Sequence, residues 1–101
     1  MISRDNDIFV GGEDKKITKY GKNLQYKKEI ETSHCILIGV ATRNYIIVGL
    51  FNGRIEIYDF DLKLIKSFHM IGVPTRFHEY YDYLIVGQQR GKVTVFNINS
   101  L

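Results

Sequence analysis

The sequence predicts an all-β protein made of repeated, four-stranded antiparallel sheets. Three observations predict this: an internal repeat of 38 residues, short β-branched segments of strand length, and Gly, Asn and Asp where the chain must turn. Val10-Gly11 recurs as Val48-Gly49 and as Val86-Gly87, and like residues stay aligned around these pairs without a gap. The aligned sets are Ile8, Ile46 and Leu84; Ile17, Ile55 and Val93; Tyr20, Tyr58 and Phe96; Lys15, Gly53 and Gly91; and Lys16, Arg54 and Lys92.

The second copy shows the elements of one repeat most clearly. Residues 45–49 are apolar and too few for a helix, so they are predicted to form a buried strand. Asn52-Gly53 predicts a hairpin with a type I′ turn, in which both central residues have positive φ. Residues 54–58 alternate polar and apolar, as a strand covered on one face does. Further strands are expected at residues 62–68 and 73–78, and no helix is predicted.

Four short strands in about 40 residues, repeated, are typical of a β-propeller blade. With strands lettered a to d from the axis outward, the chain is expected to begin at strand b and to hold ten strands. These are b-c-d over about 7–31, a full blade over about 34–69, and a-b-c over about 72–99. Because propellers close with about four to eight blades, the sequence predicts an incomplete propeller within this chain.

The repeat resembles the WD-repeat family, whose repeats carry a Gly-His pair, an Asp-bearing turn and a strand that ends in Trp-Asp. Tyr58-Asp59 stands where Trp-Asp would be, with Tyr20-Gly21 and Phe96-Asn97 as weaker versions. Ser33-His34 and Phe68-His69 stand where Gly-His would be, although the chain has no Trp. The resemblance covers nearly the whole chain and implies that His34 and His69 bond neighbouring turns. We assign structural roles within the blades to Gly11, Gly49, Gly87, Tyr20, Tyr58, Asp59, Phe96, His34 and His69.

The incomplete set of strands leaves three arrangements open, because a blade needs neighbours on both faces. The chain is part of a longer propeller, or copies of it close a ring between them, or its free strand edges pair with a different protein. Lys19 takes the position held by Ile57 and Val95 in the other copies. We therefore expect the first blade to have a less apolar face that is exposed or covered by a partner.

Composition and charge limit the number of domains, the kinds of partner and the cellular location that we expect for the protein. A chain of 101 residues with 45% hydrophobic residues is enough for one small domain. Its net charge of +3 is mild and comes without a basic tail, so nucleic acid is not an expected partner. The single cysteine, Cys35, cannot form an internal disulfide, and no apolar run is long enough to span a membrane as a helix. We expect an intracellular, cytoplasmic protein without a membrane partner.

The sequence contains no recognisable catalytic set, metal site or cofactor motif. His34, His69 and His78 lack the spacing of metal ligands. His34 and Cys35 resemble a base beside a nucleophile, but neighbours on a strand point to opposite faces, so a structural thiol is favoured. Gly11-Gly12 is interpreted as a hairpin turn because no Gly-Lys-Ser/Thr follows it.

One charged feature suggests a binding face. Basic residues fall at the turn between strands b and c in all three copies, which places them on one face of the propeller beside Phe51. We predict that this face binds acidic or phosphorylated protein segments, since Arg suits oxyanion recognition. The competing interpretation is solubilising charge on exposed turns. The predicted residues are Lys15, Lys16, Arg54, Arg90, Lys92 and Phe51.

These observations predict a non-enzymatic, protein–protein interaction scaffold that forms part of a WD-repeat-like β-propeller. The family resemblance carries most of this prediction, because WD-repeat propellers act as platforms. Two alternatives remain: a structural subunit of a large assembly whose neighbours cover the open blade edges, and a fragment of a propeller enzyme. Further blades from the same polypeptide or from other copies are expected partners in addition to other proteins.

Overall fold

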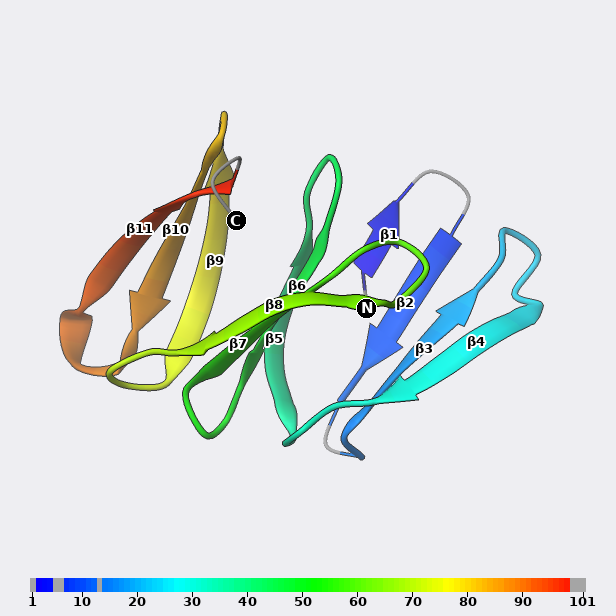
Figure 1. The fold of residues 1–101 in the computed structure, drawn as a ribbon, viewed down its shortest axis with the longest axis horizontal. Coiled ribbons are helices and arrows are strands. Elements are labelled where there is room, and N and C mark those ends of the chain that lie inside the picture. Colours follow the sequence, from blue (N-terminus) through cyan, green and yellow to red (C-terminus); the bar gives the residue numbers. More distant parts are fainter. Residues whose placement is uncertain (1, 5–6, 13, 99–101) are drawn as a thin grey trace.

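The computed structural model describes residues 2–4, 7–12 and 14–98, and it is all-β with three antiparallel sheets (Figure 1). We call the sheets blades 1, 2 and 3 in chain order. Blade 1 contains β1 (Ile2–Arg4), β2 (Asp7–Gly11), β3 (Lys16–Tyr20) and β4 (Tyr26–Glu31). Blade 2 contains β5 (Ile36–Ala41), β6 (Ile46–Leu50), β7 (Arg54–Tyr58) and β8 (Leu64–His69). Blade 3 contains β9 (Pro74–Tyr80), β10 (Tyr83–Gln88) and β11 (Val93–Asn97).

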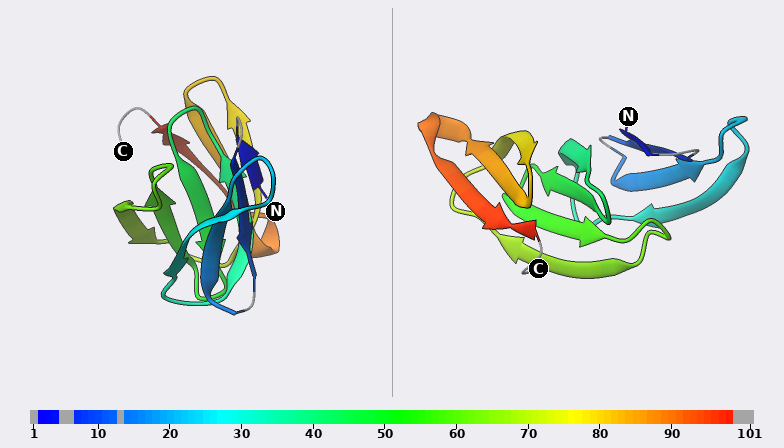
Figure 2. Two further views of the ribbon diagram at one scale, coloured as in Figure 1. Left: turned by 90° about the vertical axis from the view of Figure 1, so that its right-hand side faces the viewer. Right: turned by 90° about the horizontal axis from the view of Figure 1, so that it is seen from above.

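The blades follow one another along the long axis of the molecule, with their first strands closest together. β5 contacts both β1 and β9, whereas the outer strands of neighbouring blades spread apart (Figure 2). In each blade the strands are paired in chain order, as in the predicted a to d arrangement. The arrangement confirms the predicted all-β fold of antiparallel blades and positions an open blade face at each end of the chain.

The structure corrects the predicted number of strands. β1 pairs with β2 through Ile2 and Phe9, so the described part of the chain begins at strand a and contains eleven strands rather than ten. Blade 3 has strands a, b and c in its described residues, as predicted. A 3-10 turn, Gln89–Gly91, lies between β10 and β11, although no helix was predicted. Among the described residues, no helix has the length and apolar character needed to cross a membrane.

The hairpin at Asn52-Gly53 also differs from its prediction. Gly53 has a φ of 87°, but Asn52 is not among the residues with positive φ, so the turn is not type I′. The Gly53 N–H donates to the Leu50 carbonyl (3.0 Å), and the Asn52 side chain accepts from the Arg54 N–H (3.1 Å). This is the three-residue loop that ends in a left-handed residue. Lys15 (61°) and Gly91 (78°) hold the equivalent left-handed position in the other blades.

The 38-residue period extends to the hydrogen bonds that join each hairpin to the next connection. The Thr32 N–H donates to the Lys15 carbonyl at 2.7 Å, and its equivalent, Met70, donates to Gly53 at 2.8 Å. The Phe51 N–H donates to Cys35 and the Gln89 N–H to Val73, both at 3.0 Å and again 38 residues apart. Equivalent positions in different blades therefore have equivalent backbone environments.

Two hydrophobic clusters fill the spaces between the blades. The first lies between blades 1 and 2 and contains Phe9, Ile17, Ile46, Val48, Leu50, Tyr58 and Leu62. The second lies between blades 2 and 3 and contains Ile47, Ile55, Ile57, Leu84, Val86 and Ile98. Successive residues of β6 belong to different clusters, because side chains alternate between the faces of a sheet. Both faces of blade 2 are thus buried, whereas blades 1 and 3 each have one face against blade 2.

Candidate protein-binding surfaces

The predicted basic residues lie on one edge of the molecule, which we call the turn face. It consists of the b–c hairpins at residues 14–15, 51–53 and 89–92 and the connections between blades at residues 32–35 and 70–73. All of these segments lie at the lower edge in Figure 1. The structure therefore brings together the six predicted residues, Lys15, Lys16, Phe51, Arg54, Arg90 and Lys92, as an arc over three blades.

The cations of the turn face differ in their intramolecular contacts and in their exposure to solvent. Arg54 Nε donates to Glu56 at 3.0 Å and its Nη2 donates to Ser67 Oγ at 2.7 Å, so its guanidinium is held within blade 2. Lys16 forms an ion pair of 3.8 Å with Glu29 in blade 1. Lys15, Arg90 and Lys92 are exposed, as is Phe51, whose side chain is 45% accessible. Sequence alone missed the partner of Arg54, although Glu56 lies two residues along the strand and therefore on the same face.

The three aligned glycines have different surroundings. A Cβ placed on Gly49 would lie 2.7 Å from Cγ of Pro74, the first residue of β9 in the next blade. A Cβ on Gly11 would meet Cδ1 of Ile36, which begins β5 in blade 2, at the same distance. Gly11 and Gly49 thus allow strand a of the next blade to approach strand b. At Gly87 the nearest atom is Cβ of Arg76 in its own blade, at 3.5 Å.

A buried polar network centres on Glu56, which is 3% exposed. Its carboxylate accepts hydrogen bonds from Tyr58 Oη (2.9 Å), Arg54 Nε (3.0 Å) and Ser33 Oγ (3.1 Å). Burial, and then the adjacent Glu56 charge, raise the pKa of Tyr58 well above its usual value of 10.0. Ser33 lies in the connection from blade 1, so the network ties that connection to strand c of blade 2. Tyr20 and Phe96 hold the position of Tyr58 in blades 1 and 3, and both are only partly buried.

The residues that carried the family resemblance have mixed surroundings. Asp59 Oδ1 accepts from the N–H groups of Asp61 and Lys63, both at 2.9 Å, and so closes the turn between β7 and β8. The Nδ1 atom of His34 is buried without a hydrogen-bond partner among the described residues, so the bond that the resemblance implied for His34 does not form through this atom. His69 ends β8 and pairs in register with Arg54. The described residues hold no group of three or more His, Cys, Asp or Glu side chains arranged for a metal ion.

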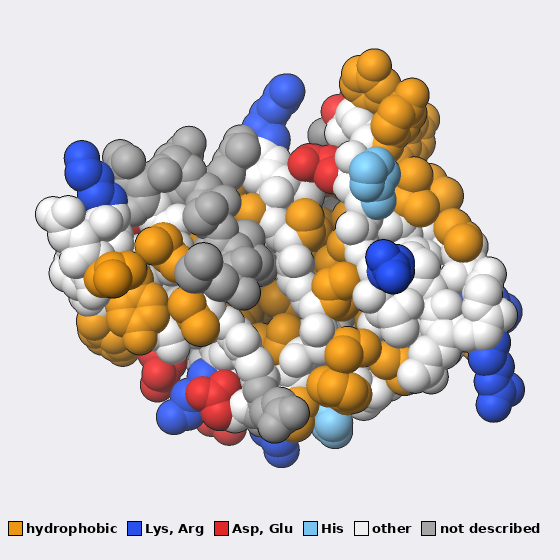
Figure 3. Space-filling model, turned by 180° about the vertical axis from the view of Figure 1, so that it is seen from behind, with side chains coloured by type: hydrophobic (Ala, Val, Ile, Leu, Met, Phe, Trp, Pro, Cys, Tyr) orange, Lys and Arg blue, Asp and Glu red, His pale blue; other side chains and the backbone are white. Residues whose placement is uncertain are grey.

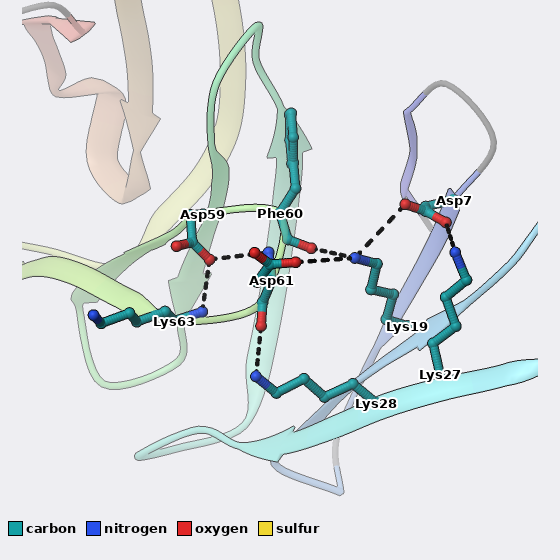
Figure 4. A network of polar contacts seen from close by, with 8 residues as sticks. All are labelled: Asp7, Lys19, Lys27, Lys28, Asp59, Phe60, Asp61 and Lys63. Atoms are coloured by element: carbon teal, nitrogen blue, oxygen red, sulfur yellow. Dashed lines mark hydrogen bonds and ion pairs between the residues drawn. The ribbon is translucent and has the colours of Figure 1, made fainter.

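Lys19 lies between blades 1 and 2 and is only 9% exposed, which corrects the expectation that its face is open or covered by a separate partner (Figure 4). Its ammonium donates to the Phe60 carbonyl at 2.5 Å and lies 3.6 Å from Asp7 and 3.8 Å from Asp61. Asp7 also accepts from Lys27 at 2.9 Å, and this hydrogen bond is the main cause of the lowered pKa of Asp7. Blade 2 itself is therefore the partner of this polar position.

Blade 3 exposes the face that blades 1 and 2 bury. We call it the trailing face and define it by Ile85, Gly87, Val93 and Val95. By the 38-residue period these residues correspond to Ile47, Gly49, Ile55 and Ile57, whose three isoleucines are at most 1% exposed. Val93 and Val95 are 64% and 57% exposed.

Blade 1 exposes the complementary face at the other end of the chain. We call it the leading face and define it by Ile8, Val10, Tyr20 and Leu24, which correspond to Ile46, Val48, Tyr58 and Leu62. Leu24 and Leu62 share the left-handed conformation, with φ of 61° and 59°. Leu62 is 3% exposed in the cluster between blades 1 and 2, whereas Leu24 is 68% exposed. Both faces follow from the 38-residue period once the alternating positions of each strand are separated by blade.

Hydrophobic side chains are also exposed at the tip of the β9–β10 hairpin, at the upper right in Figure 3. Tyr80 and Tyr81 pack edge to face with their ring centroids 4.6 Å apart, and they are 55% and 81% exposed. Both turn hydrophobic surface toward solvent on the edge opposite the turn face.

Comparisons with solved structures show the same fold. The chain is similar to the computationally designed Ika4 protein (TM-score 0.81, 18% identity, 95% of this chain and 62% of that chain). It is similar to BamB from Moraxella catarrhalis (TM-score 0.82, 18% identity, 93% and 29%) and to BBS1N in complex with ARL6DN (TM-score 0.80, 15% identity, 93% and 34%). BamB and BBS1N are β-propeller proteins, so the chain has the fold of a β-propeller section.

The chain spans less than two thirds of the length of these structures. No family model matches the sequence, and no curated protein matches it significantly.

Proposed function

We propose that this chain is a non-catalytic, protein-binding section of a β-propeller whose two open faces are completed by further blades. The observation that carries the proposal is the match between exposed and buried faces. The trailing and leading faces consist of the same positions, 38 residues apart, that form the two hydrophobic clusters inside the chain.

The free energy available from covering these faces supports the proposal. Full burial of a Val or Leu side chain contributes about 1.5–3 kcal/mol. Val93, Val95 and Leu24 are more than half exposed, so covering them contributes about 1–2 kcal/mol each. Terminal repeats that lack a polar cap are unfavourable in repeat proteins. Covering both faces would therefore add several kcal/mol to a chain of this size.

Extending the chain by one period tests this proposal. A second copy of residues 61–98, joined after Ile98, adds a strand d to blade 3 and places a second Pro74 opposite Gly87. We expect the extended chain to unfold at a higher urea concentration. Val95→Asp should cost about 2 kcal/mol or more in the extended chain, because it buries an unpaired carboxylate, and little in the original chain. Ile71→Asp, at an exposed position on the turn face, is the control and should be silent in both. Equal effects of Val95→Asp in the two chains would refute the proposal.

A second candidate function is the binding of acidic or phosphorylated protein segments at the turn face. It is favoured by the exposed cations Lys15, Arg90 and Lys92 on one edge with the exposed ring of Phe51. The complex of BBS1N with ARL6DN shows that a propeller protein of similar fold has a protein partner, which supports protein partners for this chain too.

Titration with a labelled hexaglutamate peptide tests the turn face. We expect Arg90→Glu to weaken binding severalfold at low salt, since it removes one exposed cation and adds an anion. Arg54→Gln should matter less for binding, because Glu56 and Ser67 already hold the guanidinium. Lys63→Glu, which lies away from the turn face, is the matched control. If Arg90→Glu and Lys63→Glu weaken binding equally, the charge of the turn face is solubilising only.

We further propose that the repeat is WD-like and that the protein acts inside the cell, in the cytoplasm. Tyr58-Asp59 supports the first part, because Asp59 closes the turn after strand c. The single Cys35 supports the second.

A further inference from the structure

The free edge of β11 is the most specific unpaired feature of blade 3. In blades 1 and 2, strand c pairs on one side with strand b and on the other with strand d, as β3 with β4 and β7 with β8. β11 is the third strand c, and among the described residues it pairs with β10 alone. Val93 and Val95 therefore direct their N–H and C=O groups away from β10, toward the position that strand d takes in the other blades.

The two complete blades define where such a strand would lie. Ile17 pairs with Ile30 in blade 1, and Ile55 pairs with Phe68 in blade 2, so the residue opposite Val93 is apolar. Both pairings show a register shift at the same position, between Lys19 and Tyr20 and between Ile57 and Tyr58. The position opposite Val95 corresponds to Lys28 and Lys66, so both known strands carry a lysine there.

Blades 1 and 3 share the lysine that selects a charge on this strand. Lys16 and Thr18 correspond to Lys92 and Thr94, since the residues are 76 positions apart, or two periods. In blade 1, Glu29 of strand d lies 3.8 Å from Lys16 Nζ and accepts a hydrogen bond from Thr18 Oγ1 at 3.3 Å. In blade 3, Thr94 Oγ1 already donates to Gln88 Oε1 at 2.6 Å, whereas Lys92 is exposed and forms no ion pair with a described residue. The third blade thus presents the cationic half of an ion pair whose acidic half belongs on strand d.

We propose that the β11 edge binds an extended antiparallel strand of a partner polypeptide, with an acidic residue opposite Thr94 and an apolar residue opposite Val93. Charge complementarity to Lys92 and the repeated register carry this assignment. The d strands of a second copy, β4 and β8, are not the source, because they are already paired within their own blades. The inference rests on the proposed function and adds to it the chemistry of the strand beside the trailing face.

The chain itself supplies the probe for a test. A labelled synthetic peptide of residues 24–32 carries Glu29 and Ile30 in the required register. We expect it to bind the 101-residue chain with a dissociation constant below ~1 mM, measured by fluorescence anisotropy. A peptide with Lys28→Pro should not bind, because proline removes a backbone donor from the new ladder.

A charge swap separates this strand from non-specific attraction. Lys92→Glu in the chain should weaken the binding of the native peptide by about fivefold, as expected for one exposed ion pair. A peptide with Glu29→Lys should bind the Lys92→Glu chain with the affinity that the native peptide has for the unchanged chain. Lys63→Glu, in the turn between β7 and β8 and away from both β11 and the turn face, is the matched control and should leave the swap unchanged.

Each other outcome overturns the inference. No binding of the native peptide, equal binding of the proline peptide, or a swap without recovery would refute the strand or its charge. A chain that is dimeric by light scattering and becomes monomeric with Lys92→Glu would show that another copy occupies the edge. If the peptide fails to bind but the extended chain is more stable to urea, the strand at the β11 edge is refuted and the proposed function stands.

Discussion

The substitution Gly49→Ala gives a direct test of how closely the blades approach each other. The added Cβ would lie 2.7 Å from Cγ of Pro74 and 3.1 Å from atoms of Ile38 and Phe77. The ring of Pro74 is rigid and belongs to the next blade, so the blades must separate to relieve the contact. Overpacking of this kind costs about 1–3 kcal/mol. Alanine gains back about 0.4–1 kcal/mol by restricting the unfolded chain.

We therefore expect Gly49→Ala to lower the free energy of unfolding by about 1–2 kcal/mol. Gly87→Ala is the matched control at the equivalent position, where the nearest atom is Cβ of Arg76 at an ordinary 3.5 Å. It should leave stability unchanged or raise it by up to about 1 kcal/mol. Urea unfolding with unchanged slopes measures both variants. Equal effects would mean that blade 3 does not pack against Gly49 as described.

Three further changes test the polar contacts. Tyr58→Phe removes the hydrogen bond to the buried Glu56 and should cost about 1.5–3 kcal/mol in urea unfolding, whereas a cost near zero would mean that water replaces the hydroxyl. Lys19→Met leaves a carbonyl of blade 2 without its donor and should cost about 1–3 kcal/mol, and a more stable variant would show that the ammonium is not needed between the blades. The pKa of Asp7 is lowered mainly by its hydrogen bond from Lys27, so its contribution to stability is present above the unfolded value of 3.8 and is lost as pH falls below it. Asp7→Asn should therefore reduce the acid dependence of stability below that pH, and an unchanged acid profile would contradict this.

The repeat period predicted most of the fold from sequence. β7 was predicted with its observed bounds, Arg54–Tyr58, because strict alternation between polar and apolar residues is a strong strand signal. β1 was missed because Ile2–Arg4 contains a single apolar residue and gives no alternation. The turn at Asn52 was predicted with the wrong type, because a dipeptide does not fix how many residues the loop contains.

The candidate surfaces were less predictable than the fold. The sequence placed the cations of the turn face on one edge, but the Phe60 carbonyl that accepts from Lys19 lies 41 residues away in the next blade and follows from packing alone. The exposure of Leu24 could have been predicted from the period, since its equivalent, Leu62, lies against a preceding blade. Whether a repeated position is buried depends on which neighbouring blades are present, and the repeat period alone does not determine this.

Thiol labelling at position 95 tests the central claim most directly. In a Cys35→Ala background, Val95→Cys should react with a small maleimide about as fast as a free thiol, and Ile57→Cys, at the equivalent buried position, at least about a hundredfold more slowly. In the chain extended by residues 61–98, we expect Val95→Cys to become protected to a similar degree. Equal labelling of Val95→Cys in the original and extended chains would contradict the claim that blade 3 exposes a face built to receive another blade.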